Sequence, residues 1–335
     1  MLSAMTEPTE SRRQRAARRA GEFPPAPEPL PRPVPDSHTH LDITVSEAGV
    51  PRPTAGPPAS PTAPSATATA APPAGAAGGP ANAPATDPVP ATDPVSAAIA
   101  VAAAVGVDRL VQVGVDVASS RWGVDTAARH PAVVATVALH PNEAPRLADL
   151  DEALREIETL AGHDRVRGVG ETGMDFFRTG DEGRAAQEES FRAHIAIAKR
   201  YGKALVIHDR DAHADVLRIL DDEGAPDTVV LHCFSGDAEF ARECVRRGHL
   251  LSFAGTVTFG SATALREAAA LTPLDQILVE TDAPYLTPMP HRGRPNASYL
   301  IPLTVRSLAA TTGADLDELC AAISATGDRV FGPWH

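Results

Sequence analysis

The sequence is poor in the features that mark secreted or membrane-spanning proteins. Its three cysteines, Cys233, Cys244 and Cys320, are too few for a disulfide framework, and their odd number favours a reducing cytoplasm. No apolar run approaches the ~20 residues needed to span a bilayer. The arginines at 12–19 are not followed by the apolar stretch of a secretory signal. We therefore expect a cytoplasmic protein with no membrane partner, and nothing implies an obligate protein partner.

A surplus of positive charge is also missing. The chain has 30 lysines and arginines against 43 aspartates and glutamates, for a formal net charge of −13. This balance argues against a broad basic face that binds nucleic acid through its phosphates. It does not exclude a nucleic-acid substrate that is held locally by metal ions.

Two regions lack the apolar periodicity of helices and strands. Residues 1–33 are rich in proline, arginine and glutamate, and residues 49–94 are rich in proline and alanine and contain no aromatic residue. Such segments bury too little apolar surface to offset the entropy lost on ordering. The composition predicts a disordered tail at 1–33 and a disordered insert at 49–94. Roughly 250 residues remain, which is the size of one (β/α)8 barrel, so we expect a single domain over 34–335.

In this remaining part, short aliphatic runs alternate with amphipathic helical patterns, as in an α/β protein with a parallel sheet. Asp93 and Pro94 form a helix-start signal directly after the insert. Eight strands imply a closed (β/α)8, or TIM, barrel with the insert after its first strand. The expected strands lie just before His38 and at 109–115, 132–139, 166–170, 204–207, 228–231, 249–253 and 276–280.

Polar side chains stand at the ends of these aliphatic runs. The carboxyl ends of all strands in such a barrel open on one face, where the active site is built. Singly, each residue has a structural explanation, such as a surface or core histidine or a loop salt bridge. Together, four histidines, one glutamate and one aspartate predict a site for two divalent metal ions, with Mg, Mn and Zn all compatible. The predicted ligands are His38, His40, Glu171, His208, His232 and Asp282, and His140 ends a further strand.

Three neighbours of these residues are assigned supporting roles. Asp36 is placed to orient an imidazole from behind the metal ligands. Cys233 alternates away from His232, so we interpret it as a packing residue and not as a ligand or nucleophile. Glu280 is expected to point away from the site and to be structural.

Five motifs follow one another along the chain: Asp36–Asp42, Gly170–Asp175, His208–Ala212, His232–Gly236 and Glu280–Leu286. In this order they resemble the TatD family of metal-dependent deoxyribonucleases, within the amidohydrolase superfamily. The resemblance runs from about residue 34 to the end, apart from the insert, and a tail motif at Pro290–Asn296 also matches.

The resemblance implies a barrel with two metals bridged by Glu171. It assigns His38, His40 and Asp282 to one metal, and His208 and His232 to the other. It also makes His140 a substrate-site histidine. The chain departs from the family at Asn142, where a second histidine or similar group is usual, and at Asp209, where serine is common.

These observations predict a metal-dependent hydrolase that cleaves phosphodiester bonds of DNA. Two divalent cations outweigh the carboxylates Glu171 and Asp282, so the site would attract an anionic substrate even in an acidic protein. Asp282 can also accept a proton from the attacking water. Candidates for clamping the phosphate are Arg210, Arg292 and Arg294.

Two alternatives remain open at this stage. The same constellation serves the superfamily's hydrolases of small-molecule amides, lactones and esters. A non-enzymatic role, in which the disordered arms bind partners, belongs to a different class.

Overall fold

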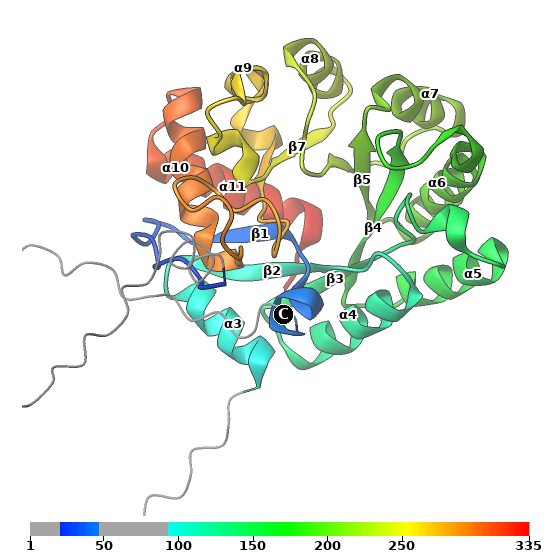
Figure 1. Cartoon of the computed structure of the whole chain (residues 1–335), viewed down its shortest axis with the longest axis horizontal. Helices are drawn as coiled ribbons and strands as arrows, with labels where there is room; N and C mark the ends of the chain where they lie inside the picture. Colours follow the sequence, from blue (N-terminus) through cyan, green and yellow to red (C-terminus); the bar gives the residue numbers. More distant parts are fainter. Residues whose placement is uncertain (1–20, 47–92, 335) are drawn as a thin grey trace, which may run out of the picture.

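The computed structural model describes residues 21–46 and 93–334 (Figure 1). It contains one eight-stranded parallel sheet whose spatial order follows the chain, which confirms the predicted (β/α)8 barrel. The strands are β1 (Val34–Thr39), β2 (Val107–Val113), β3 (Val133–Val137), β4 (Val166–Asp175), β5 (Ala204–Arg210), β6 (Val229–Leu231), β7 (Leu250–Phe253) and β8 (Ile277–Val279).

The helices form the outer ring of the barrel, and aspartates begin several of them. Asp93 accepts hydrogen bonds from the backbone of Val95 and Ser96 ahead of Pro94, as its sequence pattern predicts. None of the helices in the described ranges is long and apolar enough to cross a membrane. The α-helices are α2 (Leu41–Ser46), α3 (Pro94–Ala103), α4 (Val117–Arg129), α5 (Leu150–Ala161), α6 (Asp181–Tyr201), α7 (His213–Glu223), α8 (Ala238–Arg246), α9 (Thr263–Leu271), α10 (Ile301–Thr312) and α11 (Leu316–Phe331).

The barrel is closed between its last and first strands just beyond their regular ends. The backbone N–H of Asp282 donates to the carbonyl of His38 at 2.9 Å, and that of His40 donates to Ala283 at the same distance. Thr39 and Ala283 form a parallel bridge at this seam. Closure therefore brings the first and last predicted metal ligands together.

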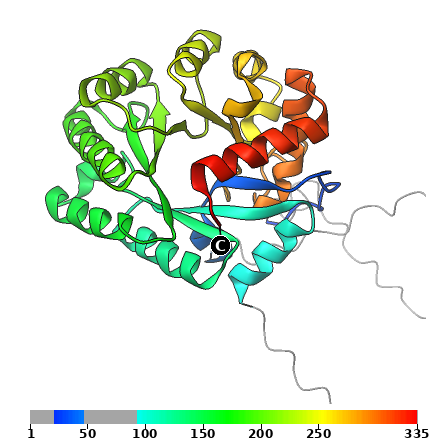
Figure 2. The ribbon, with the colours of Figure 1, turned by 180° about the vertical axis from the view of Figure 1, so that it is seen from behind.

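Side chains alternate along the strands between two apolar clusters. One cluster packs the sheet against the helices, and the other fills the barrel interior with residues such as Val111, Val206 and Leu278. Phe331 and Trp334 join the interior cluster from the end of α11, which Figure 2 shows in red across the back of the barrel. The chain end thus seals one mouth of the barrel, and the other mouth is left for polar groups.

The segment at 21–33 lies against the barrel, so the prediction of disorder is wrong for these residues. Phe23 and Leu30 are buried, and the N–H of Leu30 donates to the carbonyl of Val105 at 3.1 Å. The hydroxyl of Tyr299 donates to the carbonyl of Pro24 at 2.6 Å. Composition did not predict this packing because it counts only apolar residues within the segment. Two buried apolar side chains are enough to hold it when barrel side chains also bind its backbone carbonyls. Residues 1–20 and 47–92, which hold the rest of the predicted tail and nearly all of the insert, lie outside the described residues.

Two glycines allow β4 and β5 to approach closely beside the site. Gly170 has φ +154°, and a Cβ there would lie 2.3 Å from the carbonyl oxygen of Val206. Gly173 has φ +136°, and a Cβ there would lie 2.1 Å from the carbonyl oxygen of His208. Because only glycine fits both positions, β4 continues to Asp175. Glu171 therefore lies inside the strand, where the sequence pattern predicted it just after the strand's end.

A buried histidine couples α6 to the strand end that carries His140. The Nε2 atom of His194 accepts a hydrogen bond from the backbone N–H of Leu139 at 3.0 Å, and its Nδ1 donates to the carbonyl of Ser190 at 2.6 Å. Burial lowers the pKa of His194 to about 4. The neutral ring is therefore the form that the fold holds, since protonation of Nε2 would break the bond to Leu139.

This histidine should make stability depend on pH. Its pKa is lower in the folded chain than the ~6.5 of an unfolded histidine, so its contribution is complete above pH 6.5 and is lost as pH falls from there toward 4. We expect about 2 kcal/mol of unfolding free energy to be lost between pH 7.5 and pH 5 through this group. Urea denaturation of wild type and His194→Gln at both pH values measures it. An equal loss in both proteins would contradict the assignment.

Candidate metal centre

Glu171 lies at the centre of the predicted ligands, with its two oxygens facing different sets of histidines. Its Oε2 lies 3.3 Å from His38 Nε2 and 3.9 Å from His40 Nε2. Its Oε1 lies 2.7 Å from His208 Nδ1 and 2.9 Å from His232 Nε2. A carboxylate whose oxygens face two separate donor groups is placed to bridge two cations.

The sixth predicted ligand completes the first of these groups. Asp282 Oδ1 lies 3.3 Å from His40 Nε2 and 3.7 Å from His38 Nε2. Burial opposes ionisation of Asp282, but the hydrogen bond from His40 and the charge of His38 lower its pKa below the usual value. Burial also opposes ionisation of Glu171, but the neighbouring His232 and His140 outweigh it and hold the pKa of Glu171 well below normal. Both carboxylates are therefore ionised and available as ligands.

The donor atoms fit divalent cations. His38 is fully buried, and neither of its ring nitrogens has a hydrogen-bond partner among the described residues. A buried polar atom without a partner is costly, and a cation between His38 and the two carboxylates would remove that cost. Nitrogen and carboxylate donors within 4.8 Å of one another form three overlapping groups: His38, Glu171 and His232; His38, His40 and Asp282; and His140, Glu171 and His208.

His140 lies closer to these ligands than its expected substrate role required. Its Nε2 is 3.2 Å from Glu171 Oε1, and its ring packs edge-on against that of His208, with centroids 4.6 Å apart. The structure therefore brings all seven predicted residues to one mouth of the barrel. His140 is placed either to touch a substrate beside His208 or to act as a ligand of a cation held there with Glu171 and His208.

Two carboxylates hold the histidine ligands in position, and sequence reasoning gave neither of them this role. Asp175 Oδ2 lies 3.3 Å from His208 Nε2, and Glu280 Oε1 lies 3.2 Å from His232 Nδ1. Partial burial favours a higher pKa for Asp175, but hydrogen bonds from His208 and Asn142 outweigh it and lower that pKa. Carboxylates behind metal-binding histidines fix the ring orientation and raise its basicity.

A sequence signal existed for one of the two. Asp175 follows Glu171 by four residues, which puts both side chains on one face of an extended strand. Glu280 was expected to point away, and that prediction is wrong. Regular β8 ends at Val279, and the backbone turns at Asp282, which has φ +52°. Strand alternation therefore does not apply to residues 280–282.

Asp36 binds Thr281 and the backbone N–H of His38, and not an imidazole as the sequence predicted. Its carboxylate accepts hydrogen bonds from the N–H and hydroxyl of Thr281 at 2.9 and 2.6 Å, and His38 Nδ1 has no partner in the described structure. Burial raises the pKa of Asp36 to about 7. Its role is to fasten the loop that carries Asp282. Buried Asn296 fastens the same loop by donating to the carbonyls of Thr281 and Tyr285.

Cys233 is half-buried and belongs to neither apolar cluster of the described residues, so its packing role stays a prediction. Its backbone N–H donates to Glu280 Oε1 at 2.8 Å, and no described metal-ligand group includes its sulfur. Burial raises the pKa of the Cys233 thiol well above its usual value. A thiol held neutral in this way is a poor ligand or nucleophile.

The three arginines proposed as phosphate clamps have different surroundings. Arg210 and Arg292 are exposed and lie over the rings of Phe177 and Phe259, with Cζ at 4.1 and 4.6 Å from the ring centroids. Arg294 donates from Nε to the carbonyl of Glu22 at 2.8 Å and from Nη2 to that of Phe23 at 2.5 Å. The prediction for Arg294 is therefore not supported, because its guanidinium is used to hold the N-terminal segment.

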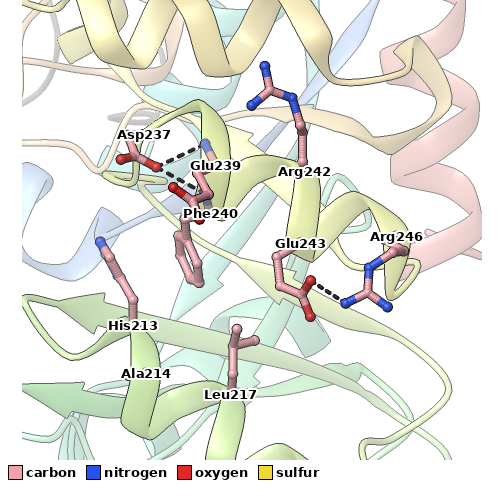
Figure 3. Close-up of a pocket in the computed structure, with 9 residues that line it drawn as sticks. All are labelled: His213, Ala214, Leu217, Asp237, Glu239, Phe240, Arg242, Glu243 and Arg246. Atoms are coloured by element: carbon pink, nitrogen blue, oxygen red, sulfur yellow. Dashed lines mark hydrogen bonds and ion pairs between the residues drawn. The ribbon is translucent and has the colours of Figure 1, made fainter.

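A hollow of about 570 Å³ lies away from this centre, on the outer ring between α7 and α8. Figure 3 shows His213 of α7 beside Phe240 of α8, whose rings stack with centroids 4.1 Å apart. None of the predicted ligands lines the hollow. A contact from its lining toward the centre is that of His213 Nδ1 with Asp209, the residue after His208, at 2.7 Å. The chemistry therefore points to the barrel mouth and not to this hollow.

Comparison with known proteins agrees with this geometry. Residues 84–332 match the family described as TatD related DNase. The chain is 49% identical to the uncharacterized metal-dependent hydrolase TatD of Mycobacterium tuberculosis over 230 residues, which are 68% of this chain and 86% of the relative. It is 35% identical to the 3'-5' ssDNA/RNA exonuclease TatD of Citrobacter rodentium, over 68% of this chain and 87% of that protein.

A solved structure shows the same architecture. The TatD homologue YJJV from Escherichia coli superposes with a TM-score of 0.67 at 26% identity, covering 72% of this chain and 95% of that one. The family match begins after His38 and His40, since the insert separates them from the rest of the domain. Barrel closure nevertheless sets them beside Asp282. The chain belongs to the TatD family and is a metal-dependent hydrolase.

Proposed function

We propose that this chain hydrolyses phosphodiester bonds of DNA at a centre that holds two divalent metal ions, in the cytoplasm. The observation that supports the proposal is the position of the Glu171 carboxylate, whose two oxygens face separate sets of donors. When bound, the cations would polarise phosphate oxygens and lower the pKa of a water molecule. His38, His40 and Asp282 would hold one cation, His208 and His232 the other, and Glu171 both.

The chain's own residues supply the remaining functions. Asp282 is ionised and lies at the open mouth, so it can accept the proton of the attacking water. Glu280 would hold the ring of His232 in a fixed orientation during the reaction, and Asp175 would do the same for His208. Arg210 and Arg292 are exposed in loops or strand ends on the same face and can donate hydrogen bonds to phosphate oxygens.

A substrate panel tests this function. Purified protein with Mg²⁺, Mn²⁺ or Zn²⁺ should cleave single-stranded or nicked DNA, and EDTA should abolish the cleavage. Product length on denaturing gels is the measurement, and a set of lactones and simple amides is the comparison. Turnover of a lactone or amide while DNA stays intact would instead assign the chain to the small-molecule hydrolases of the superfamily.

A further inference from the structure

Large apolar side chains are exposed mainly around the mouth that carries the metal centre. In the described part of the chain, four of the five follow the carboxyl ends of strands: Leu147, Phe177, Tyr285 and Met289. The fifth, Tyr201, ends α6 and lies toward the opposite mouth. Single exposed apolar residues are common, but a bias to one end indicates a surface that binds a ligand with apolar faces.

Phe177 is the most exposed of these, at 62%, yet its backbone is fixed. Asp175 Oδ1 accepts hydrogen bonds from the N–H groups of Phe177 at 2.9 Å and Arg178 at 2.8 Å. The other oxygen of Asp175 faces His208. One carboxylate therefore contacts both the metal-facing imidazole and the backbone at Phe177, which fixes where this exposed side chain leaves the chain beside the centre.

Arg210 covers one side of this ring and extends the flat surface. Its Cζ lies 4.1 Å from the Phe177 centroid, and its carbonyl accepts the N–H of Phe176 at 2.9 Å. It follows His208 by two residues on β5. Arg292 and Phe259 form a comparable pair beyond β8 and β7. Aromatic rings and guanidinium planes are the two surfaces on which unpaired nucleobases stack.

We propose that Phe177 and Arg210 form a stacking platform for an unpaired nucleobase of the substrate. The inference rests on the proposed function. The bases of a duplex are stacked on each other and do not present a free face, whereas a single strand can place a base on the platform while a neighbouring phosphate reaches the metal centre.

The test crosses one variant with one change in the substrate. Wild type and Phe177→Ala are compared on a single-stranded oligonucleotide and on the same strand with abasic tetrahydrofuran units flanking the cleavage site. Loss of one stacked base weakens binding by about five- to 150-fold. We expect the KM of wild type to rise by this factor on the abasic strand. Phe177→Ala should already show this raised KM on the natural strand, and its KM should rise no further on the abasic strand.

Two further variants separate stacking from charge and from general surface effects. Arg210→Lys keeps the charge but loses the plane, so it should raise KM for the natural strand more than for the abasic strand. Tyr201→Ala is the matched control, because Tyr201 is also an exposed aromatic with a cation over it, Lys203, but lies toward the other mouth. It should leave KM for both strands unchanged.

The outcomes distinguish this inference from the function on which it rests. If wild type cleaves both strands equally well, or if Phe177→Ala weakens both by the same factor, the platform is refuted and the nuclease function stands. If wild type neither cleaves an oligonucleotide nor binds it, as measured by fluorescence anisotropy with metal present, the nuclease function and the platform both fall.

Discussion

Replacement of Glu171 by glutamine should reduce hydrolysis by at least about a thousandfold, because metal ions supply several kcal/mol of transition-state stabilisation. Glutamine keeps the shape but has one neutral oxygen where Glu171 presents two charged ones to four histidines. Bound metal, measured by mass spectrometry after desalting, should fall together with activity.

The variant should still fold. Glu171 is buried among the predicted ligands. Removing its charge lowers the cost of burying a carboxylate as well as the attraction to the histidines, so the thermal midpoint is expected to change little. Glu189→Gln, at an exposed position on α6, is the matched control and should retain both metal and activity. Full metal content and activity in Glu171→Gln would show that this carboxylate is not the bridge.

Asp282→Asn should have the second-largest effect, a fall in kcat of about 10²- to 10⁴-fold. The amide cannot accept the proton of the attacking water, and it is a weaker ligand beside His38 and His40. Asparagine tolerates the positive φ of 52° at this position as well as aspartate does. Stopped assays at saturating substrate, with metal content determined on the same samples, measure the effect.

An aspartate with the same backbone conformation provides the control. Asp211 has φ +58°, is exposed and follows β5 on the same face of the barrel. Asp211→Asn should keep kcat within about twofold, since Asp211 is in none of the described ligand groups and exposed substitutions outside such groups have small effects. If Asp282→Asn kept the wild-type kcat, the proton acceptor would have to be sought elsewhere, with His140 the next candidate at the mouth.

The order of elements and the predicted metal ligands follow from local sequence. A short aliphatic run of about four to eight residues is typical of a buried strand, and eight such runs alternating with helices indicate a closed barrel. Polar residues at the ends of those runs must then meet at one mouth. This reasoning placed His38, Glu171 and Asp282 together although they are far apart in the chain, and the distances between them agree.

The support around those ligands was decided only by the tertiary structure. Glu280 reaches His232 because the chain leaves regular strand geometry after β8, and no alternation rule applies there. Arg294 binds the carbonyls of residues 22 and 23 because barrel closure brings the two segments together. Contacts of this kind depend on which surfaces meet after folding, and composition carries no record of them.

The sequence by itself thus determined the barrel and which six side chains are predicted as metal donors at its open mouth, because strand period and strand-end position are local properties. The tertiary structure decided which oxygen of Glu171 faces which histidines, that Asp175 serves both His208 and Phe177, and that residues 21–33 pack on the barrel. Those features depend on the close approach of β4 to β5 and on barrel closure at Ala283. Both are distances between segments that no single stretch of sequence specifies.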